Sequence, residues 1–201
     1  MKTLLKICSS IIVVTLLIVL TTACSDIDSV TSNSKETITQ DLQSNNIENI
    51  KRPFRFSTIG PAEFLEPGAE GSVQRCNEEG LLTVRYSGEG EAIHLGHHTF
   101  ISTNCSPFPF PAPSITNITK GITIFTAANG QDKLITSFSG QQEFNENGEG
   151  TVTVVNEIIG GEGKFKGATG QTTGGGSGSG GIVSTESSGY IIFDASNRSD
   201  L

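Results

Sequence analysis

The hairpin signal that decides the fold lies in residues 121–138, which read GITIFTAANGQDKLITSF. Apolar and polar side chains alternate in residues 121–125 and again in residues 134–138, as expected where one face of a strand is buried. Asn129-Gly130 lies between the two runs, and this pair favours the positive backbone φ angles of a tight hairpin turn. The stretch therefore predicts two antiparallel strands joined by a short turn.

The same pattern recurs on both sides of this hairpin. Short alternating runs cover residues 82–86, 92–95, 150–154 and 189–193, and Asn147-Gly148 marks a second hairpin position. No long run with helical periodicity separates them, so consecutive strands are expected to pair antiparallel. We predict an all-β domain over residues 54–195, a single up-and-down antiparallel β-barrel of about eight strands, because a closed barrel leaves no long exposed edge.

Two segments interrupt the pattern. Residues 106–113 read SPFPFPAP, and their prolines cannot donate to a strand ladder, which predicts a loop or an edge segment of polyproline character. Residues 174–181 read GGGSGSGG. This composition is typical of flexible chain, so it predicts either a mobile loop or a glycine-rich stretch that leads into the last strand.

The N-terminus has the layout of an export signal. Lys2 and Lys6 precede an almost purely apolar run, residues 11–20, and small residues then lead to Cys24. This order predicts a lipoprotein signal peptide over residues 1–23, with cleavage before Cys24 and lipidation of that residue by diacylglycerol and a further acyl chain such as palmitate. The alternative is an ordinary secretory signal in which Cys24 has no role.

Residues 24–53 are mostly Ser, Thr, Asn, Asp and Gln, which predicts a flexible tether between the lipid bilayer and the barrel. We expect an exported lipoprotein of the bacterial outer membrane, on its periplasmic side or at the cell surface. Cleavage would remove two of the 13 basic residues and leave 11 against 21 acidic ones, a formal charge of −10. So acidic a chain is not suited to binding nucleic acid.

Cys76 and Cys105 are the two cysteines of the predicted barrel domain. Export places both thiols in an oxidising compartment, so we predict a disulfide between them. Cys76 precedes an Asn-Glu-Glu-Gly turn and Cys105 precedes the proline-rich segment, so the bond would pin that segment to a neighbouring strand. The alternative is a pair of free buried thiols that pack as small apolar residues.

Residues 158–170 read IIGGEGKFKGATG, which resembles the turn between two late strands in allene oxide cyclase and dirigent-like barrel proteins. In that turn the paired glycines allow positive φ angles, and Phe165 and Ala168 would fill the barrel end. Residues 88–96, GEGEAIHLG, and 127–132, AANGQD, resemble segments of bacterial lipoproteins with this barrel. The resemblance implies the fold over residues 60–193. It implies no catalytic residue, because one fold hosts many activities.

The three histidines, His94, His97 and His98, fall in one stretch. On a strand, His94 and His98 share a face but lie roughly 13 Å apart, and His97 points to the opposite face. A single transition-metal ion needs its ligands at about 2 Å, so this spacing predicts no metal site, unless a bulge at Gly96 brings the rings together. We also predict no other cofactor.

The sequence contains no arrangement typical of a catalytic site, and its paired glutamates lie beside Gly and Asn in turn-like segments. We expect a non-enzymatic envelope protein whose barrel binds a small apolar ligand or serves as an interaction module. The alternative is a cyclase or isomerase in the barrel mouth, which needs polar or ionisable groups buried beside a cavity. His94, Arg85, Tyr86 and Glu143 are the candidates for such groups. The ligand and the oligomeric state stay open.

Overall fold

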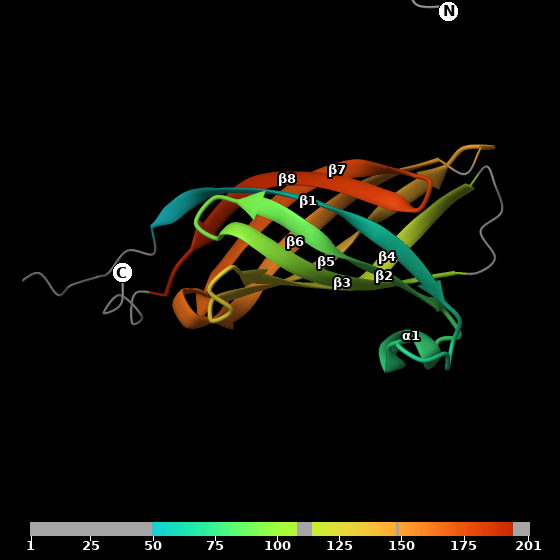
Figure 1. Cartoon of the computed structure of the whole chain (residues 1–201), viewed down its shortest axis with the longest axis horizontal. Helices are drawn as coiled ribbons and strands as arrows, with labels where there is room; N and C mark the ends of the chain where they lie inside the picture. Colours follow the sequence, from blue (N-terminus) through green and yellow to red (C-terminus); the bar gives the residue numbers. More distant parts are fainter. Residues whose placement is uncertain (1–49, 108–113, 148, 195–201) are drawn as a thin grey trace, which may run out of the picture. The chain divides into compact units, whose positions relative to one another are not determined.

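The computed structural model describes residues 50–107, 114–147 and 149–194. These residues form a closed barrel in which each strand pairs antiparallel with the next and β8 pairs with β1 (Figure 1). The predicted all-β up-and-down barrel is therefore confirmed. The strands are β1 Lys51–Leu65, β2 Leu82–Ala92, β3 Gly96–Ser106, β4 Ser114–Ala127, β5 Lys133–Phe144, β6 Gly150–Glu162, β7 Thr169–Ser179 and β8 Ile182–Ile192.

The hairpin that decides the fold forms as predicted, between β4 and β5. Asn129 Oδ1 accepts hydrogen bonds from the backbone N–H groups of Gln131 and Asp132, each at 3.0 Å. Gly130 has φ 70°, a conformation that glycine adopts without a steric cost. Beyond the turn, Phe125 pairs with Leu134, so the two alternating runs are in register.

Two local predictions were wrong. Residues 92–95 were predicted as a strand, but β2 ends at Ala92 and the next three residues form the turn to β3, with His94 at φ 69°. The glycine-rich segment was predicted as a loop or a lead-in to a strand, but most of it belongs to β7. Glycine fits there because the backbone of β8 leaves no room for a side chain: a Cβ atom at Gly174 would overlap the carbonyl oxygen of Glu186.

The apolar core lies at one end of the barrel, where β1 begins and β8 ends; we call it the closed end. The motif at residues 158–170 forms the connection there, with a short 3₁₀ helix, η1 Gly163–Phe165, between β6 and β7. Phe165 and Ala168 are buried in the core, which confirms their predicted place at the barrel end. The core residues are Phe54, Phe56, Leu95, Phe100, Phe125, Ala127, Leu134, Ile158, Phe165, Ala168 and Ile191.

The opposite end, the open end, carries the β1–β2 connection with its short helix α1, Gln74–Asn77. Cys76 of α1 forms a disulfide with Cys105 of β3, as predicted, and their Cα atoms are 5.2 Å apart. Arg75 strengthens the same junction, because its guanidinium donates to the carbonyl oxygens of Lys120 at 2.9 Å and Thr103 at 3.1 Å. The disulfide thus ties the β1–β2 connection to the side of the barrel.

The predicted signal peptide and Cys24 lie outside the described residues, as do residues 108–113 of the proline-rich segment. Strand β1 begins at Lys51, so residues 51–53, which were predicted to belong to the tether, start the first strand. In the part of the chain that the structure describes, no helix is long and apolar enough to cross a membrane.

Candidate functional site

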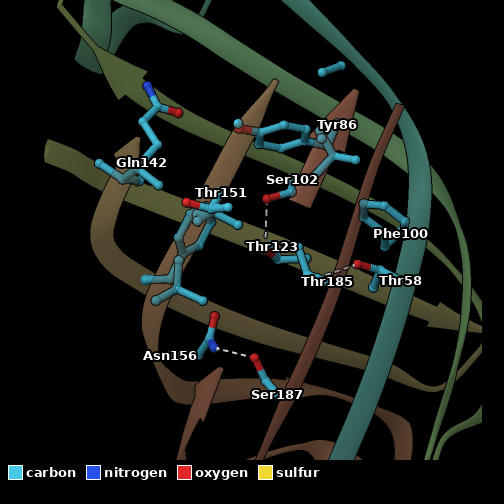
Figure 2. Close-up of a pocket in the computed structure, with 18 of the residues that line it drawn as sticks. Thr58, Tyr86, Phe100, Ser102, Thr123, Gln142, Thr151, Asn156, Thr185 and Ser187 are labelled. Atoms are coloured by element: carbon cyan, nitrogen blue, oxygen red, sulfur yellow. Dashed lines mark hydrogen bonds between the residues drawn. The ribbon is translucent and has the colours of Figure 1, made fainter. Parts of the chain in front are cut away.

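A cavity of about 120 Å³ occupies the half of the barrel between the apolar core and the open end. All eight strands contribute to its lining, β2 with Tyr86 and β7 with Gly178 as single residues and the other strands with two or more each. Figure 2 shows the side chains converging from opposite strands. Its lining consists of Phe56, Thr58, Ala62, Phe64, Tyr86, Phe100, Ser102, Ile118, Thr123, Phe125, Phe138, Gln142, Phe144, Gly150, Thr151, Val152, Val154, Asn156, Gly178, Val183, Thr185 and Ser187.

The inner floor of the cavity carries pairs of hydroxyl groups, which rest on the apolar core. Thr58 Oγ1 of β1 lies 2.7 Å from Thr185 Oγ1 of β8, and Ser102 Oγ of β3 lies 2.9 Å from Thr123 Oγ1 of β4. These contacts are drawn as dashed lines in Figure 2. Since the strands of each pair are neighbours and the residues face inward at the same level, the register of the barrel creates both pairs.

A buried amide completes this floor on the other side of the barrel. Asn156 of β6 donates from Nδ2 to Thr172 Oγ1 of β7 at 3.1 Å and to Ser187 Oγ of β8 at 3.3 Å. Asn156, Thr172 and Ser187 are all buried. The floor is thus polar but uncharged, and most of its groups already have a partner within the protein, as buried polar groups need.

The walls towards the open end are mainly apolar. Phe64, Phe144, Val152 and Val183, which lie near the ends of their strands at the open end, line this part of the cavity. Phe64 is 49 % exposed, which places it at the rim, where β1 ends. A molecule that entered from the open end would therefore pass an apolar collar before it reached the hydroxyl floor.

Two further polar side chains, Tyr86 and Gln142, line the cavity. Tyr86 pairs with Ser102 of the floor across β2 and β3, whereas Gln142 pairs with Val152 of the apolar wall across β5 and β6. Burial raises the pKa of Tyr86 to about 12, so its phenol is neutral at physiological pH. Gln142 donates from Nε2 to Ser106 Oγ at 2.8 Å. Figure 2 shows Tyr86 and Gln142 on the same side of the cavity, away from the bond between Asn156 and Ser187.

Of the four residues predicted from the sequence as candidates for polar groups inside the barrel, one lines the cavity. Tyr86 does so. Glu143 is exposed on the outer face of β5, and Arg85 alternates with Tyr86 and so points outward from β2. His94 lies in the β2–β3 turn at the closed end, with Nε2 3.2 Å from the carbonyl oxygen of Pro53.

The histidine cluster differs from its predicted geometry, because the three residues do not share one strand. His98 is buried on the inner face of β3, and its ring packs edge-on against Phe125 with centroids 5.2 Å apart. His97 is exposed, with Nδ1 3.2 Å from Glu91 and Nε2 3.8 Å from Glu89. Among the described residues, no group of three or more His, Cys, Asp and Glu side chains could hold a metal ion.

The hydroxyl floor was not predicted from the sequence. Thr58, Ser102, Thr123 and Thr185 each alternate with residues whose side chains point outward, and several of those outward residues are isoleucines. The usual assumption that the apolar residues of an alternating strand face the core therefore assigns these threonines to the outside.

No family model matches this chain, and no curated protein or solved structure proved significantly similar to it.

Proposed function

We propose that this protein is an exported envelope lipoprotein whose barrel binds a small, largely apolar ligand in the cavity at its open end. The observation that carries this proposal is the contrast between the two halves of the barrel. One half is filled by eleven buried apolar residues, whereas the other keeps about 120 Å³ of empty space. An engineered apolar cavity of about 150 Å³ is known to admit benzene, so a small ring or short chain fits this volume.

Binding without catalysis agrees best with the groups that line the cavity. Tyr86 is the one ionisable residue among them, and its pKa of about 12 means that it gives up its proton only at strongly alkaline pH. General acid–base catalysis at neutral pH depends on a group with a pKa near the working pH. The proposal therefore ranks a ligand-binding barrel above the cyclase or isomerase alternative.

Tyr86 offers a direct test of binding, because the chain has two tyrosines and no tryptophan. In a Tyr190→Phe variant, Tyr86 is the remaining tyrosine, and its fluorescence should change in a saturable way when cyclohexanol or toluene is added. Ala62→Phe, which places a ring in the cavity, should abolish the change. The matched control is Ser57→Phe, which lies on the outer face of the same strand and should bind normally.

The origin of the chain in the cell envelope is proposed from its N-terminal residues. A basic start, an apolar run over residues 11–20 and Cys24 support lipid anchoring, and the disulfide between Cys76 and Cys105 agrees with an oxidising compartment. The buried Phe165 and Ala168 support a relationship in fold to the allene oxide cyclase and dirigent-like barrels. That relationship supports an architecture and leaves the activity undetermined.

Lipid anchoring is tested by metabolic labelling with palmitate in the bacterial host. The wild-type chain should be labelled and should fractionate with membranes, whereas Cys24→Ala should be unlabelled and released. Cys8→Ala is the matched control and should behave as wild type. Equal labelling of the Cys24→Ala chain would contradict the proposal.

A further inference from the structure

The cavity is lined without a single charged side chain. Its lining contains no Lys, Arg, His, Asp or Glu, although the whole chain carries 34 Lys, Arg, Asp and Glu residues, 13 basic and 21 acidic. Tyr86 is the remaining ionisable group, and it stays neutral at physiological pH. Nothing in the cavity can therefore neutralise a charge that a ligand brings with it.

A charged head group would lose its hydration in this cavity and gain no counter-ion. Transfer of an isolated carboxylate or ammonium group into such surroundings is very costly, since buried charges require a partner of opposite sign. The acidic balance of the chain adds a general repulsion for anions. The lining therefore discriminates against fatty acids and other anions in particular.

The hydroxyl pairs of the floor suit an uncharged polar group. Each hydroxyl has one proton to donate and two lone pairs to accept with, and within a pair one proton is used. Either partner can be the donor in the Thr58–Thr185 and Ser102–Thr123 contacts, which leaves each pair one further proton and spare lone pairs. A ligand hydroxyl or carbonyl could bind to such a pair without any loss of the internal hydrogen bond.

The order of the groups along the cavity sets the orientation of a ligand. The apolar collar of Phe64, Phe144 and Val183 lies at the open end, and the hydroxyl pairs lie deeper, against the core. An amphipathic molecule matches this order when its polar end enters first and its apolar body stays within the collar.

We infer that the ligand is an uncharged molecule with a compact apolar body and a single hydroxyl or carbonyl group, bound with that group against the Ser102–Thr123 and Thr58–Thr185 pairs. This inference rests on the proposed function, since it names the class of ligand for the same cavity. The volume of the cavity favours a ligand of which roughly six to eight non-hydrogen atoms lie inside the barrel, near the size of benzene.

The test compares three probes that share one ring: cyclohexanol, cyclohexanecarboxylate and cyclohexane. Binding is followed at neutral pH by Tyr86 fluorescence in the Tyr190→Phe background and by calorimetry. Cyclohexanol should bind at least roughly tenfold more tightly than the carboxylate, because desolvation of the unpaired charge opposes binding. It should also bind more tightly than cyclohexane.

The second arm removes one hydroxyl pair with Ser102→Ala/Thr123→Val. Replacing both partners leaves neither unsatisfied, so the barrel should remain folded. Affinity for cyclohexanol should fall roughly five- to tenfold, whereas affinity for cyclohexane should be unchanged or higher. The matched control, Thr99→Val/Thr126→Val, changes a pair at opposed positions on the outer face of the same two strands and should leave both affinities unchanged.

The outcomes separate the two proposals. If no probe binds, the proposed function is wrong and the inference falls with it. If the carboxylate binds as tightly as cyclohexanol, or if the double variant weakens cyclohexanol and cyclohexane equally, the cavity binds ligands but the inferred class is wrong.

Discussion

Thr123 and Thr136 face each other across β4 and β5, yet their hydroxyl groups have different surroundings. Thr123 Oγ1 contacts Ser102, whereas Thr136 Oγ1 is buried and has no hydrogen-bond partner among the described residues. His98 Nε2 and both polar side-chain atoms of Asn104 are also buried without a hydrogen-bond partner among the described residues. Individual side chains inside this barrel therefore range from satisfied to unsatisfied, and the difference determines what their replacement does to stability.

Thr136→Val should leave the free energy of unfolding unchanged or raise it by up to about 1 kcal/mol, because a methyl group replaces a buried hydroxyl that has no partner. Thr123→Val removes the hydrogen-bond partner of Ser102 and should lower the free energy of unfolding by about 1 kcal/mol. Urea unfolding of both variants measures the contrast. Equal destabilisation would mean that Thr136 is hydrogen-bonded in solution.

His98 should make the barrel sensitive to mild acid. Burial lowers its pKa, although the backbone of Gly96 and the charge of Glu91 act in the opposite direction. The folded state therefore prefers the neutral ring, while the unfolded chain takes up a proton below the ordinary pKa of about 6.5. The contribution of neutral His98 to stability is therefore fully present above that pH. It is lost as the pH falls from there towards the lowered pKa of the folded state.

The measurement is urea unfolding at pH 7.5 and at pH 5.5. The wild type should lose more stability between these values than His98→Gln, in which the titrating group is absent. His97→Gln removes the exposed neighbour, which makes the smallest contribution to the lowered pKa of His98, and should lose nearly as much stability as the wild type. If His98→Gln and the wild type lose the same amount, protonation of His98 does not contribute.

Among the elements, the β4–β5 hairpin was predictable and the inner face of the barrel was not. The β4–β5 hairpin follows from Asn129-Gly130 and two alternating runs, which are local signals. The same alternation does not say which side is inside: Ile124 points outward and is 40 % exposed, while Thr123 faces the cavity. Closure of the barrel decides this, because it brings hydroxyl groups from β1, β3, β4 and β8 together, and no local pattern encodes that arrangement.

Strand β7 was the element least visible in the sequence, because its glycines read as a flexible linker. In the barrel they allow β7 and β8 to approach each other, so that a Cβ atom at Gly176 would overlap the carbonyl oxygen of Ser184. Composition predicted mobility here, whereas the packing of two strands required small residues. The requirement becomes visible only when the neighbouring strand is known.

Gly176→Val should therefore lower the free energy of unfolding by about 1–3 kcal/mol, since the strands must move apart to admit the side chain. Ser177→Val is the matched control, because residue 177 is exposed on the opposite face of β7. Its effect should stay within about 0.5 kcal/mol. Thermal unfolding of both variants provides the comparison, and a Gly176→Val barrel as stable as the control would refute the close approach.

At the scale of the whole molecule, apolar packing and the disulfide stabilise opposite ends of the barrel. The core fills the closed end, and the Cys76–Cys105 bond ties down the connection at the open end. The cavity lies between these two regions, and neither cysteine lines it. The disulfide therefore adds a covalent link at the end of the barrel where the cavity leaves the packing incomplete.

Loss of the disulfide should lower the free energy of unfolding by about 3–4 kcal/mol, the effect expected for a cross-link that spans 29 residues. Reduction of the wild type and the Cys76→Ser/Cys105→Ser variant should give similar unfolding curves. Adding a reductant to that variant should change nothing further. If reduction leaves the wild-type midpoint in urea unchanged, the bond does not stabilise the barrel.

The pairing of Lys51 with Ile192 also means that the first and last strands of the barrel meet at the same end. A short peptide could join them, and the chain could then be opened at any hairpin without breaking a strand, which makes the barrel suitable for circular permutation. The hairpin at which the chain is opened would decide which end of the barrel carries the new termini, and so which end faces a surface to which they are attached. New termini at Asn129-Gly130 would lie at the closed end, whereas termini at Gly180-Gly181 would lie at the open end, beside the cavity. A permuted barrel fixed to a surface could thus be held with its cavity facing away from that surface or towards it.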